Sequence, residues 1–204
     1  MLKLNRVYPV VDSSVWVRRL GAVGVRLIQL RVKDRAEAEI RAEIREAKRL
    51  CVRAGAQLIV NDYWQAALAE GCDFVHLGQG DLDTADVPAI RKAGIRIGIS
   101  THSHEELERA LALSPDYVAL GPIYPTVLKV MPWKPQGLER ITEWKQRVGD
   151  IPLVAIGGLT VERLPGVFAA GADSAAVVND IVSNRDPEGR AREWLKTAGA
   201  GAND

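Results

Sequence analysis

Cysteine and net charge are both scarce in this sequence, and each shortage excludes a class of protein. The 204 residues include only two cysteines, Cys51 and Cys72, and their spacing matches no metal-binding pattern. The 27 basic residues nearly balance the 26 acidic ones, which leaves a formal charge of +1. Such a chain has no overall basic field that would attract nucleic acid or an anionic membrane. Any anion-binding site must therefore be local.

Long apolar runs are also missing. No run approaches the ~20 residues that a membrane-spanning helix needs, and the first ten residues lack the charged-then-apolar pattern of a signal peptide. Together with the two cysteines, this predicts a reduced, cytoplasmic protein. With 47% hydrophobic residues the chain can bury one sizeable core. We expect a single domain over residues 1–204, with a frayed tail at 196–204.

Two patterns alternate along the chain. Helical patterns cover Arg35–Arg53, Ser103–Leu113, Thr160–Gly171 and Asp186–Lys196. Short apolar runs typical of strands occur at Arg6–Asp12, Val25–Val32, Gln57–Asp62, Phe74–Gly78, Arg96–Thr101, Tyr117–Ile123, Pro152–Gly158 and Ser174–Ile181. Apolar strands that alternate with helices indicate a parallel sheet covered by those helices.

Eight such units predict a compact (β/α)8 barrel, the TIM-barrel fold, although the chain is shorter than the roughly 250 residues typical of that fold. The alternative is an open doubly wound sheet. The first strand of that architecture often leads into a glycine-rich turn. Here the first strand leads into Asp12-Ser13-Ser14 without a glycine, which favours the barrel.

In a barrel, chemistry gathers where the strands end, and the second strand ends in polar residues. Gln29, Arg31 and Lys33 are two apart and therefore point to one side, while Leu30 and Val32 point to the other. If the apolar pair packs under the helices, the polar trio faces the barrel mouth. Desolvated cations there would need an anion. The alternative is that strand pairing ends at Gln29 and that water solvates the charges.

The third and fourth strands end in oxygen ligands. Asn61 and Asp62 end one strand and Asp81 follows the next, so two carboxylates can meet across neighbouring loops. Mg²⁺ favours one or two carboxylates together with water and substrate phosphate oxygens. The alternative for Asp62 is a helix N-cap. His76, which has no suitably spaced second histidine, is interpreted as a packed or hydrogen-bonded strand residue.

The last two strands end in residues suited to phosphate. Gly157 and Gly158 follow the seventh strand, and Val178 and Asn179 follow the eighth. Barrels often bind phosphate with these two loops and a short helix N-terminus. Paired glycines are also common in plain turns.

The segment from Gly121 to Gly137 combines four prolines, two lysines and a tryptophan in one connection. Long connections of this kind in compact domains are usually functional. We expect this loop to close over a phosphorylated substrate, with Lys129 on the anion and Pro132, Trp133 and Pro135 as a stiff cover. The alternative is that Trp133 only packs on the barrel rim.

Several motifs, in order and across nearly the whole chain, resemble thiamine phosphate synthase. They are QLRVKD, VNDYWQAALAEGCDFVHLGQGDL, IGISTHSHEELERA, YVALGPIYPT and VAIGGLT followed by FAAGADSAAVV. The resemblance implies a transferase that joins the pyrimidine diphosphate and thiazole phosphate precursors of thiamine in the presence of Mg²⁺, releasing pyrophosphate. It implies small-molecule partners, and the sequence carries no signal for an oligomeric state.

The resemblance also implies roles for individual residues. Three cations would be catalytic, namely Arg31, Lys33 and Lys129. The pyrimidine diphosphate would be held by Gln29, Arg31, Lys33, Asn61, Ser100 and Lys129. The thiazole phosphate would be held at Thr126, Leu128, Gly158, Val178 and Asn179. The metal would be held by Asp62 and Asp81.

The sequence departs from the family pattern at two of these positions. Leu128 stands where the family usually has threonine, and Asn179 stands where serine is common. Two alternatives to a synthase are a thiazole tautomerase and a catalytically silent sensor of thiamine precursors. The tautomerase branch usually has a histidine after the glycine that ends the sixth strand, whereas this chain has Pro122. A phosphosugar isomerase on the same barrel is the weakest alternative, because Asp12 has no evident acid–base partner.

Overall fold

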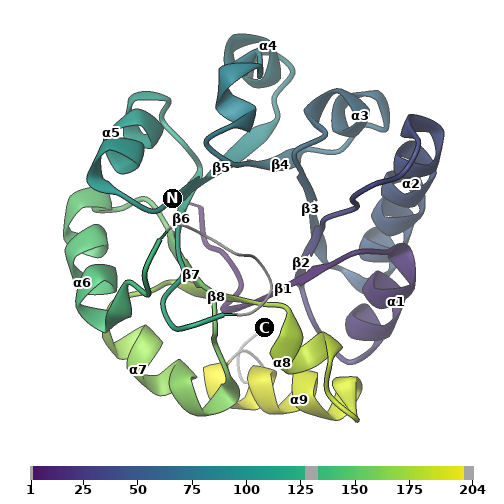
Figure 1. Cartoon of the computed structure of the whole chain (residues 1–204). Coiled ribbons are helices and arrows are strands. Elements are labelled where there is room, and N and C mark those ends of the chain that lie inside the picture. Colours follow the sequence, from purple (N-terminus) through teal and green to yellow (C-terminus); the bar gives the residue numbers. More distant parts are fainter. Residues whose placement is uncertain (1, 127–132, 200–204) are drawn as a thin grey trace.

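A computed structural model describes residues 2–126 and 133–199 of the chain. Eight parallel strands follow one another around a closed barrel, with β1 paired to both β2 and β8 (Figure 1). The predicted barrel is therefore confirmed. The strands are β1 Val7–Val11, β2 Leu27–Leu30, β3 Gln57–Asn61, β4 Phe74–Leu77, β5 Arg96–Thr101, β6 Tyr117–Leu120, β7 Leu153–Ile156 and β8 Ser174–Val177.

Helices surround the barrel (Figure 1). The α-helices are α1 Ser14–Ala22, α2 Glu37–Ala54, α3 Trp64–Ala69, α4 Val87–Lys92, α5 His104–Ala112, α6 Gly137–Val148, α7 Leu164–Ala169, α8 Asn179–Val182 and α9 Pro187–Ala198. Two 3₁₀ turns, η1 Asp81–Asp83 and η2 Val161–Arg163, precede α4 and α7. None of the helices in the described part of the chain is long and apolar enough to cross a membrane.

Two apolar layers explain why the strands read as continuous hydrophobic runs. Side chains such as Leu30 and Val32 point outward and pack with the helices, whereas their neighbours point into the barrel. The inner layer includes three aromatic residues, Tyr8, Phe74 and Tyr117. Because both faces of each strand are buried, alternation of polar and apolar residues is lost in this sheet.

The long helix α2 shows how the sequence sets an element and its end. Its buried residues Ile40, Ile44, Ala47 and Cys51 recur at helical spacing. The helix ends at Gly55, which has a φ of 63° and so adopts the left-handed conformation that glycine accepts without strain.

Two predicted elements need correction. The single helix expected over residues 160–171 is a 3₁₀ turn followed by α7, because Pro165 lacks the N–H that a continuous helix would use. The tail expected to fray from residue 196 is helical up to Ala198, whose side chain is fully buried. Arg6 Nη1 also donates a hydrogen bond of 2.7 Å to the Ala198 carbonyl, so the end of α9 is held against the barrel.

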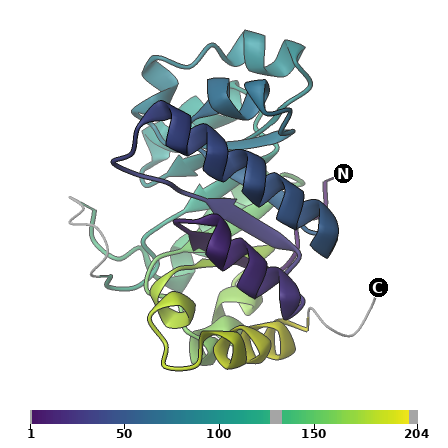
Figure 2. The ribbon, with the colours of Figure 1, turned by 90° about the vertical axis from the view of Figure 1, so that its right-hand side faces the viewer.

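The two ends of the barrel differ. The residues before β1 lie at the end where the strands begin, and Leu4 packs into the inner layer there. In Figure 2 that N-terminal segment emerges at the right of the barrel. The end where the strands finish is left open for a site, as the barrel fold requires.

Candidate active site

A cavity of about 630 Å³ opens at the carboxyl ends of the strands. Its size is typical of pockets for small molecules. Eight of the residues to which the family resemblance assigns a role line it, and they come from six different strands or the loops that follow them. They are Gln29, Arg31, Asn61, Ser100, Thr126, Gly158, Val178 and Asn179. The structure thus brings distant motifs to one place, while the role of each residue remains a prediction.

The three polar residues Gln29, Arg31 and Lys33 differ in their exposure to water. Gln29 is 5% exposed, whereas Arg31 and Lys33 lie beyond the end of β2 and are exposed. The expectation that both cations are desolvated is therefore wrong, because strand pairing ends at Leu30 and water reaches the charges. Leu30 and Val32 do pack under the helices as expected. Arg31 lines the cavity and makes no ion pair with any described carboxylate.

The two predicted metal ligands lie at the rim beside the cavity. Asp62 has a φ of 63° and pairs with Lys33, and the N-cap of α3 is Tyr63, so Asp62 does not act as a helix cap. The Asp81 carboxylate accepts a 2.8 Å hydrogen bond from the Gly78 N–H. Partial burial raises the pKa of Asp81, and the neighbouring Asp62 carboxylate raises it further.

The effect of Asp62 on Asp81 means that the two carboxylates are close to each other. Two adjacent carboxylates with a partly buried member form a donor set that suits a divalent cation. No group of three or more His, Cys, Asp or Glu side chains arranged for a metal occurs among the described residues. Further ligands would therefore have to come from water and a phosphorylated substrate, as Mg²⁺ favours.

A buried network of hydrogen bonds lies beneath the cavity. Gln29 Nε2 donates to the Tyr8 hydroxyl at 2.8 Å, and that oxygen lies 2.9 Å from the Tyr117 hydroxyl. The Tyr117 hydroxyl is 2.6 Å from His76 Nδ1, and His76 Nε2 is 2.8 Å from Ser100 Oγ. These five residues, hereafter the buried network, come from five strands. The network crosses the inside of the barrel from β2 to β5.

Burial keeps the members of the network uncharged. Desolvation lowers the pKa of His76 to about 4, an effect that the Asp62 charge partly opposes. Desolvation likewise raises the pKa of Tyr8, and it raises that of Tyr117 well above its ordinary value. His76 is therefore a neutral imidazole near pH 7, with one nitrogen that donates and one that accepts. The interpretation of His76 as a hydrogen-bonded strand residue is confirmed.

The paired glycines after β7 allow two segments of backbone to pack closely. A Cβ on Gly157 would lie 2.6 Å from Pro122 Cα, and one on Gly158 would lie 2.5 Å from the Pro125 carbonyl oxygen. Both glycines also have positive φ values. They let the loop after β6 lie directly against β7, where Ile123 N donates to the Ile156 carbonyl at 2.9 Å. This contact forms one wall of the cavity.

The segment from Gly121 to Gly137 is partly outside the described residues, and that part includes Leu128, Lys129 and Pro132. Of the remainder, Trp133 stacks on His102 with ring centroids 5.8 Å apart and an interplanar angle of 6°. Trp133 is 38% exposed. This contact is the rim packing expected under the alternative for Trp133.

Sequence reasoning missed three residues of this site. Tyr8 and Tyr117 sit inside strands, where aromatic residues are ordinary core residues and carry no local signal. Arg163 lines the cavity, donates to the Gly158 carbonyl and stacks at 4.2 Å over the Tyr124 ring. Its position soon after the paired glycines was a signal, because that loop was already expected to bind phosphate.

Comparisons with known proteins agree on one family. The family model described as thiamine monophosphate synthase matches residues 7–181. A thiamine-phosphate synthase of Rhizobium etli is 60% identical over 194 residues, which is 95% of this chain and 95% of that protein. The thiamine-phosphate synthase of an Enterobacter species is 47% identical over 195 residues, or 96% and 92% of the two chains.

A solved structure agrees with these sequences. The thiamine phosphate pyrophosphorylase of Pyrococcus furiosus superimposes with a TM-score of 0.86 at 26% identity, covering 98% of each chain. A 3-hexulose-6-phosphate synthase, at 19% identity and a TM-score of 0.69, shares the fold alone.

Proposed function

Because this chain belongs to the thiamine monophosphate synthase family and is a transferase with thiamine-phosphate synthase activity, we propose which substrates it joins and how. The substrates are 4-amino-2-methyl-5-hydroxymethylpyrimidine diphosphate and thiazole phosphate, and the products are thiamine phosphate and pyrophosphate. The observation that carries this proposal is that residues of both predicted substrate sites line one cavity. Gln29 and Ser100 belong to one predicted site, and Gly158 and Asn179 belong to the other.

The pyrimidine diphosphate binds between β2 and β5. Gln29, Asn61 and Ser100 are its proposed hydrogen-bond partners, which is supported by their lining one cavity together with Arg31. Arg31 and Lys33, both exposed at the rim, hold the diphosphate. Because water screens these charges before binding, we propose that they gain most of their strength when the substrate covers them.

Asp62 and Asp81 would hold Mg²⁺, and the diphosphate would supply further oxygen ligands. The adjacent carboxylates support this assignment, and so does the ion pair between Lys33, a proposed diphosphate ligand, and Asp62. When bound, Mg²⁺ supplies positive charge to the leaving pyrophosphate. The positive φ of Asp62 turns the backbone sharply after β3 and so sets where its carboxylate lies.

The thiazole phosphate binds on the opposite side of the mouth. Thr126, Gly158 and the backbone N–H groups of Val178 and Asn179 are its proposed ligands, and Arg163 adds a nearby cation. Leu128, which lies outside the described residues, contributes no hydroxyl donor. The Asn179 side-chain amide is able to donate where the family commonly has serine.

The proposed reaction is dissociative and needs no nucleophilic side chain. Loss of pyrophosphate leaves a cation on the pyrimidine methylene carbon, and the thiazole nitrogen captures it. Arg31, Lys33 and Lys129 stabilise the charge that develops on the leaving group. The two binding sites hold the rings close enough to react, and the loop from Gly121 to Gly137 excludes water that would trap the cation.

The first test is product formation. Purified protein is incubated with both substrates and Mg²⁺, and thiamine phosphate is measured after oxidation to its fluorescent product. We expect product that EDTA abolishes and that falls at least ~100-fold in Lys129→Ala. Lys134→Ala, which removes an exposed lysine from the same connection, is the matched control and should retain activity.

Two results would refute parts of this proposal. An enzyme that forms no product from these substrates would refute the substrate assignment. Activity that is unchanged in EDTA would refute the role of Mg²⁺. We further propose that the enzyme works in the cytoplasm, with support from two buried cysteines that are free thiols in the structure.

A further inference from the structure

The centre of the buried network lies below the cavity and lines none of it. Tyr8 is 1% exposed and Tyr117 is fully buried, whereas Gln29, His76 and Ser100 line the cavity. The buried tyrosine hydroxyls therefore connect groups on two walls of the mouth without meeting a ligand themselves. No described buried side-chain nitrogen or oxygen lacks a hydrogen-bond partner, so the network is fully satisfied.

The direction of these hydrogen bonds is a property of the whole network. Each tyrosine has one O–H donor, and neutral His76 has one N–H. If Gln29 donates to Tyr8, then Tyr8 donates to Tyr117, Tyr117 donates to His76 Nδ1, and His76 Nε2–H donates to Ser100. The Gln29 carbonyl oxygen then faces the mouth as an acceptor, and the Ser100 hydroxyl is free to donate.

The opposite direction requires every member to change. Ser100 then donates to His76 Nε2, and each later bond reverses until Tyr8 donates to a rotated Gln29 amide. A mixed arrangement would leave two donors or two acceptors facing each other inside the barrel, which is costly for buried groups. The hydrogen-bonding character of Gln29 is therefore tied to that of Ser100.

We propose that Tyr8, Tyr117 and His76 are positioning residues that couple Gln29 to Ser100, so that the mouth recognises a ring's amino donor and ring-nitrogen acceptor as one pattern. This inference rests on the proposed function, in which Gln29 and Ser100 contact the pyrimidine. The ligand class it selects is a heteroaromatic ring with an exocyclic amine. The amine donates to the Gln29 oxygen, and a ring nitrogen accepts from Ser100.

Tyr117→Phe tests the coupling because it removes the middle hydroxyl without touching the ligand. We expect KM for the pyrimidine diphosphate to rise about 10-fold, while kcat at saturation changes less than about 3-fold. The control is Ser174→Ala, which deletes an equally buried hydroxyl that donates to the Asn5 carbonyl at 2.7 Å, where the strands begin. Tyr8→Phe interrupts the network at a second point and should match Tyr117→Phe.

The imidazole of His76 gives a readout that simple destabilisation would not move. In ¹⁵N NMR with the pyrimidine diphosphate bound, we expect wild type to hold the Nε2–H tautomer and Tyr117→Phe to show a mixture of tautomers. Unchanged KM and tautomer in both tyrosine variants would overturn the coupling. That failure differs from failure of the proposed function, because the latter would appear as a wild-type enzyme that makes no thiamine phosphate.

A different surface, on the outside of the barrel, carries a second and independent observation. Helices α1 and α2 lie side by side there (Figure 2), and an open groove of about 730 Å³ runs between them. A Cβ on Gly21 would be 3.0 Å from that of Ala54, so the helices approach closely at one end of it. The groove lies where β2 begins and so faces away from the mouth.

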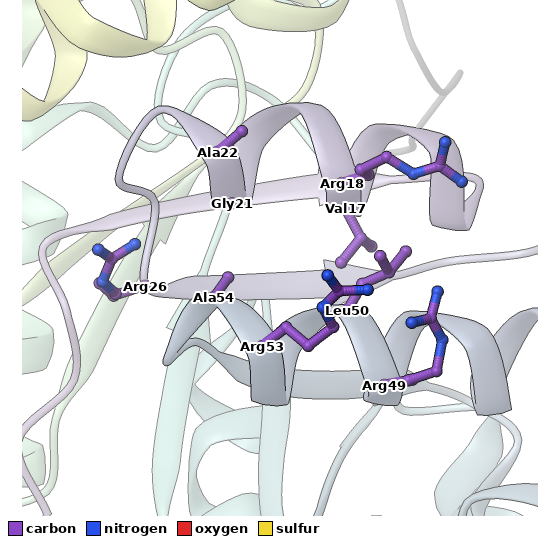
Figure 3. A pocket seen from close by; sticks show the side chains of 9 residues that line it. All are labelled: Val17, Arg18, Gly21, Ala22, Arg26, Arg49, Leu50, Arg53 and Ala54. Atoms are coloured by element: carbon purple, nitrogen blue, oxygen red, sulfur yellow. The ribbon is translucent and has the colours of Figure 1, made fainter.

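Four arginines line this groove, hereafter the arginine groove: Arg18, Arg26, Arg49 and Arg53 (Figure 3). Of these four arginines, only Arg49 has an ion-pair partner in the described part of the chain, namely Glu46 at 2.6 Å. The hydrogen bond from Arg49 lowers the pKa of Glu46, and the charges of Arg18 and Arg53 contribute to the same shift. The four arginine charges, set against the one paired carboxylate, give the arginine groove a local charge near +3 in a chain of net charge +1.

Independently of the mouth, we infer that the arginine groove binds a phosphate-bearing anion. Like charges held this close repel each other unless an anion neutralises them, and the planar guanidinium group suits phosphate oxygens. The floor formed by Val17, Leu50 and Ala54 is apolar, so it accommodates the uncharged part of a small phosphorylated molecule.

The probes are inorganic phosphate and inorganic pyrophosphate, each titrated at constant ionic strength while the Nε–Hε NMR signals of Arg26 and Arg49, which line the same groove, are followed. We expect saturable shifts, with binding at least ~10-fold weaker in the double variant Arg18→Gln/Arg53→Gln. Comparison of the two dissociation constants shows whether the groove prefers a single phosphate or a diphosphate. Turnover should be unchanged, because neither arginine lies at the mouth.

The control is Arg41→Gln, which removes an α2 arginine that already pairs with Glu70 at 2.9 Å. Its phosphate affinity should equal that of wild type. The inference is overturned if chloride at the same ionic strength produces the same shifts, or if the double variant binds as tightly as the control.

Discussion

At the residue scale, Asp62 shows how one position combines backbone geometry with chemistry. Its φ of 63° is uncommon for a residue other than glycine, and among such residues Asn and Asp adopt it most readily. The carboxylate pairs with Lys33 and lies beside Asp81. The positive φ does not require a negative charge. The conformational role and the charge of Asp62 can therefore be tested separately.

We predict that Asp62→Asn lowers kcat by about 100-fold and raises the Mg²⁺ concentration needed for half-maximal rate. Asparagine accepts the same φ, so thermal stability should fall by less than about 1 kcal/mol. Asp34→Asn is the matched control, because Asp34 also has a positive φ of 54° but is exposed beyond the site. Equal rates in the two variants, measured across a Mg²⁺ titration, would contradict a metal-binding role.

At the element scale, the inner face of the barrel depends on one strand leaving room for its neighbour. Gly98 on β5 pairs with Tyr117 on β6, and a Cβ at Gly98 would lie 2.0 Å from Tyr117 Cζ. The tyrosine ring cannot move aside, because Phe74 packs against it with ring centroids 5.6 Å apart and the Tyr8 hydroxyl holds its oxygen. The absence of a side chain on β5 is thus what places the Tyr117 hydroxyl in the buried network.

Gly98→Ala should therefore destabilise the protein by about 3 kcal/mol, since overpacking at a rigid site forces the backbone to shift. Urea denaturation followed by fluorescence measures this change. The comparison is Gly80→Ala, where an added Cβ meets nothing within 4 Å and φ is −67°, and where we expect a change below about 0.5 kcal/mol. A tolerated Gly98→Ala would show that the Tyr117 ring moves freely, and it would weaken the case for the buried network.

At the scale of the whole molecule, closure of the barrel joins every strand to two others. A sheet without edges gives no obvious place for one part to unfold before the rest. Cys51 on α2 and Cys72 before β4 are both buried in the apolar layer where the helices pack on the closed sheet. Their thiols therefore report on whether the barrel opens.

We predict one cooperative unfolding transition, with fluorescence and circular dichroism curves that coincide, as expected of a single domain. At pH 8 an aromatic disulfide reagent should react with neither thiol until that transition. Burial raises the pKa of Cys51 to about 12 and that of Cys72 to about 11, so both remain protonated in the fold. Thiol labelling before unfolding, or two separate transitions, would contradict the single-domain prediction.

The same pKa shifts give a pH dependence of stability. The folded protein holds these two protons more tightly than the unfolded chain, whose thiols titrate near the ordinary value of 9.0. This contribution to stability is complete below about pH 9 and is lost as the pH rises toward 11 to 12. The urea midpoint should therefore fall over that range, and less so in Cys51→Ser.

The sequence by itself determined the order of strands and helices and the family, because both are written in local features. Apolar runs and helical spacing predict elements within a few residues, and motifs such as QLRVKD and VAIGGLT are contiguous. Residues at strand ends were also predictable, since a parallel barrel collects those ends at one mouth.

Only the tertiary structure decided which side chains meet inside the barrel and which charges stay in water. The hydroxyls of Tyr8 and Tyr117 are in contact although 109 positions separate them in the chain, and nothing local marks either tyrosine. Arg31 and Lys33 are exposed because β2 ends at Leu30, and that end is set by pairing with β3. Such contacts depend on register and closure, which arise from the packing of all eight strands together.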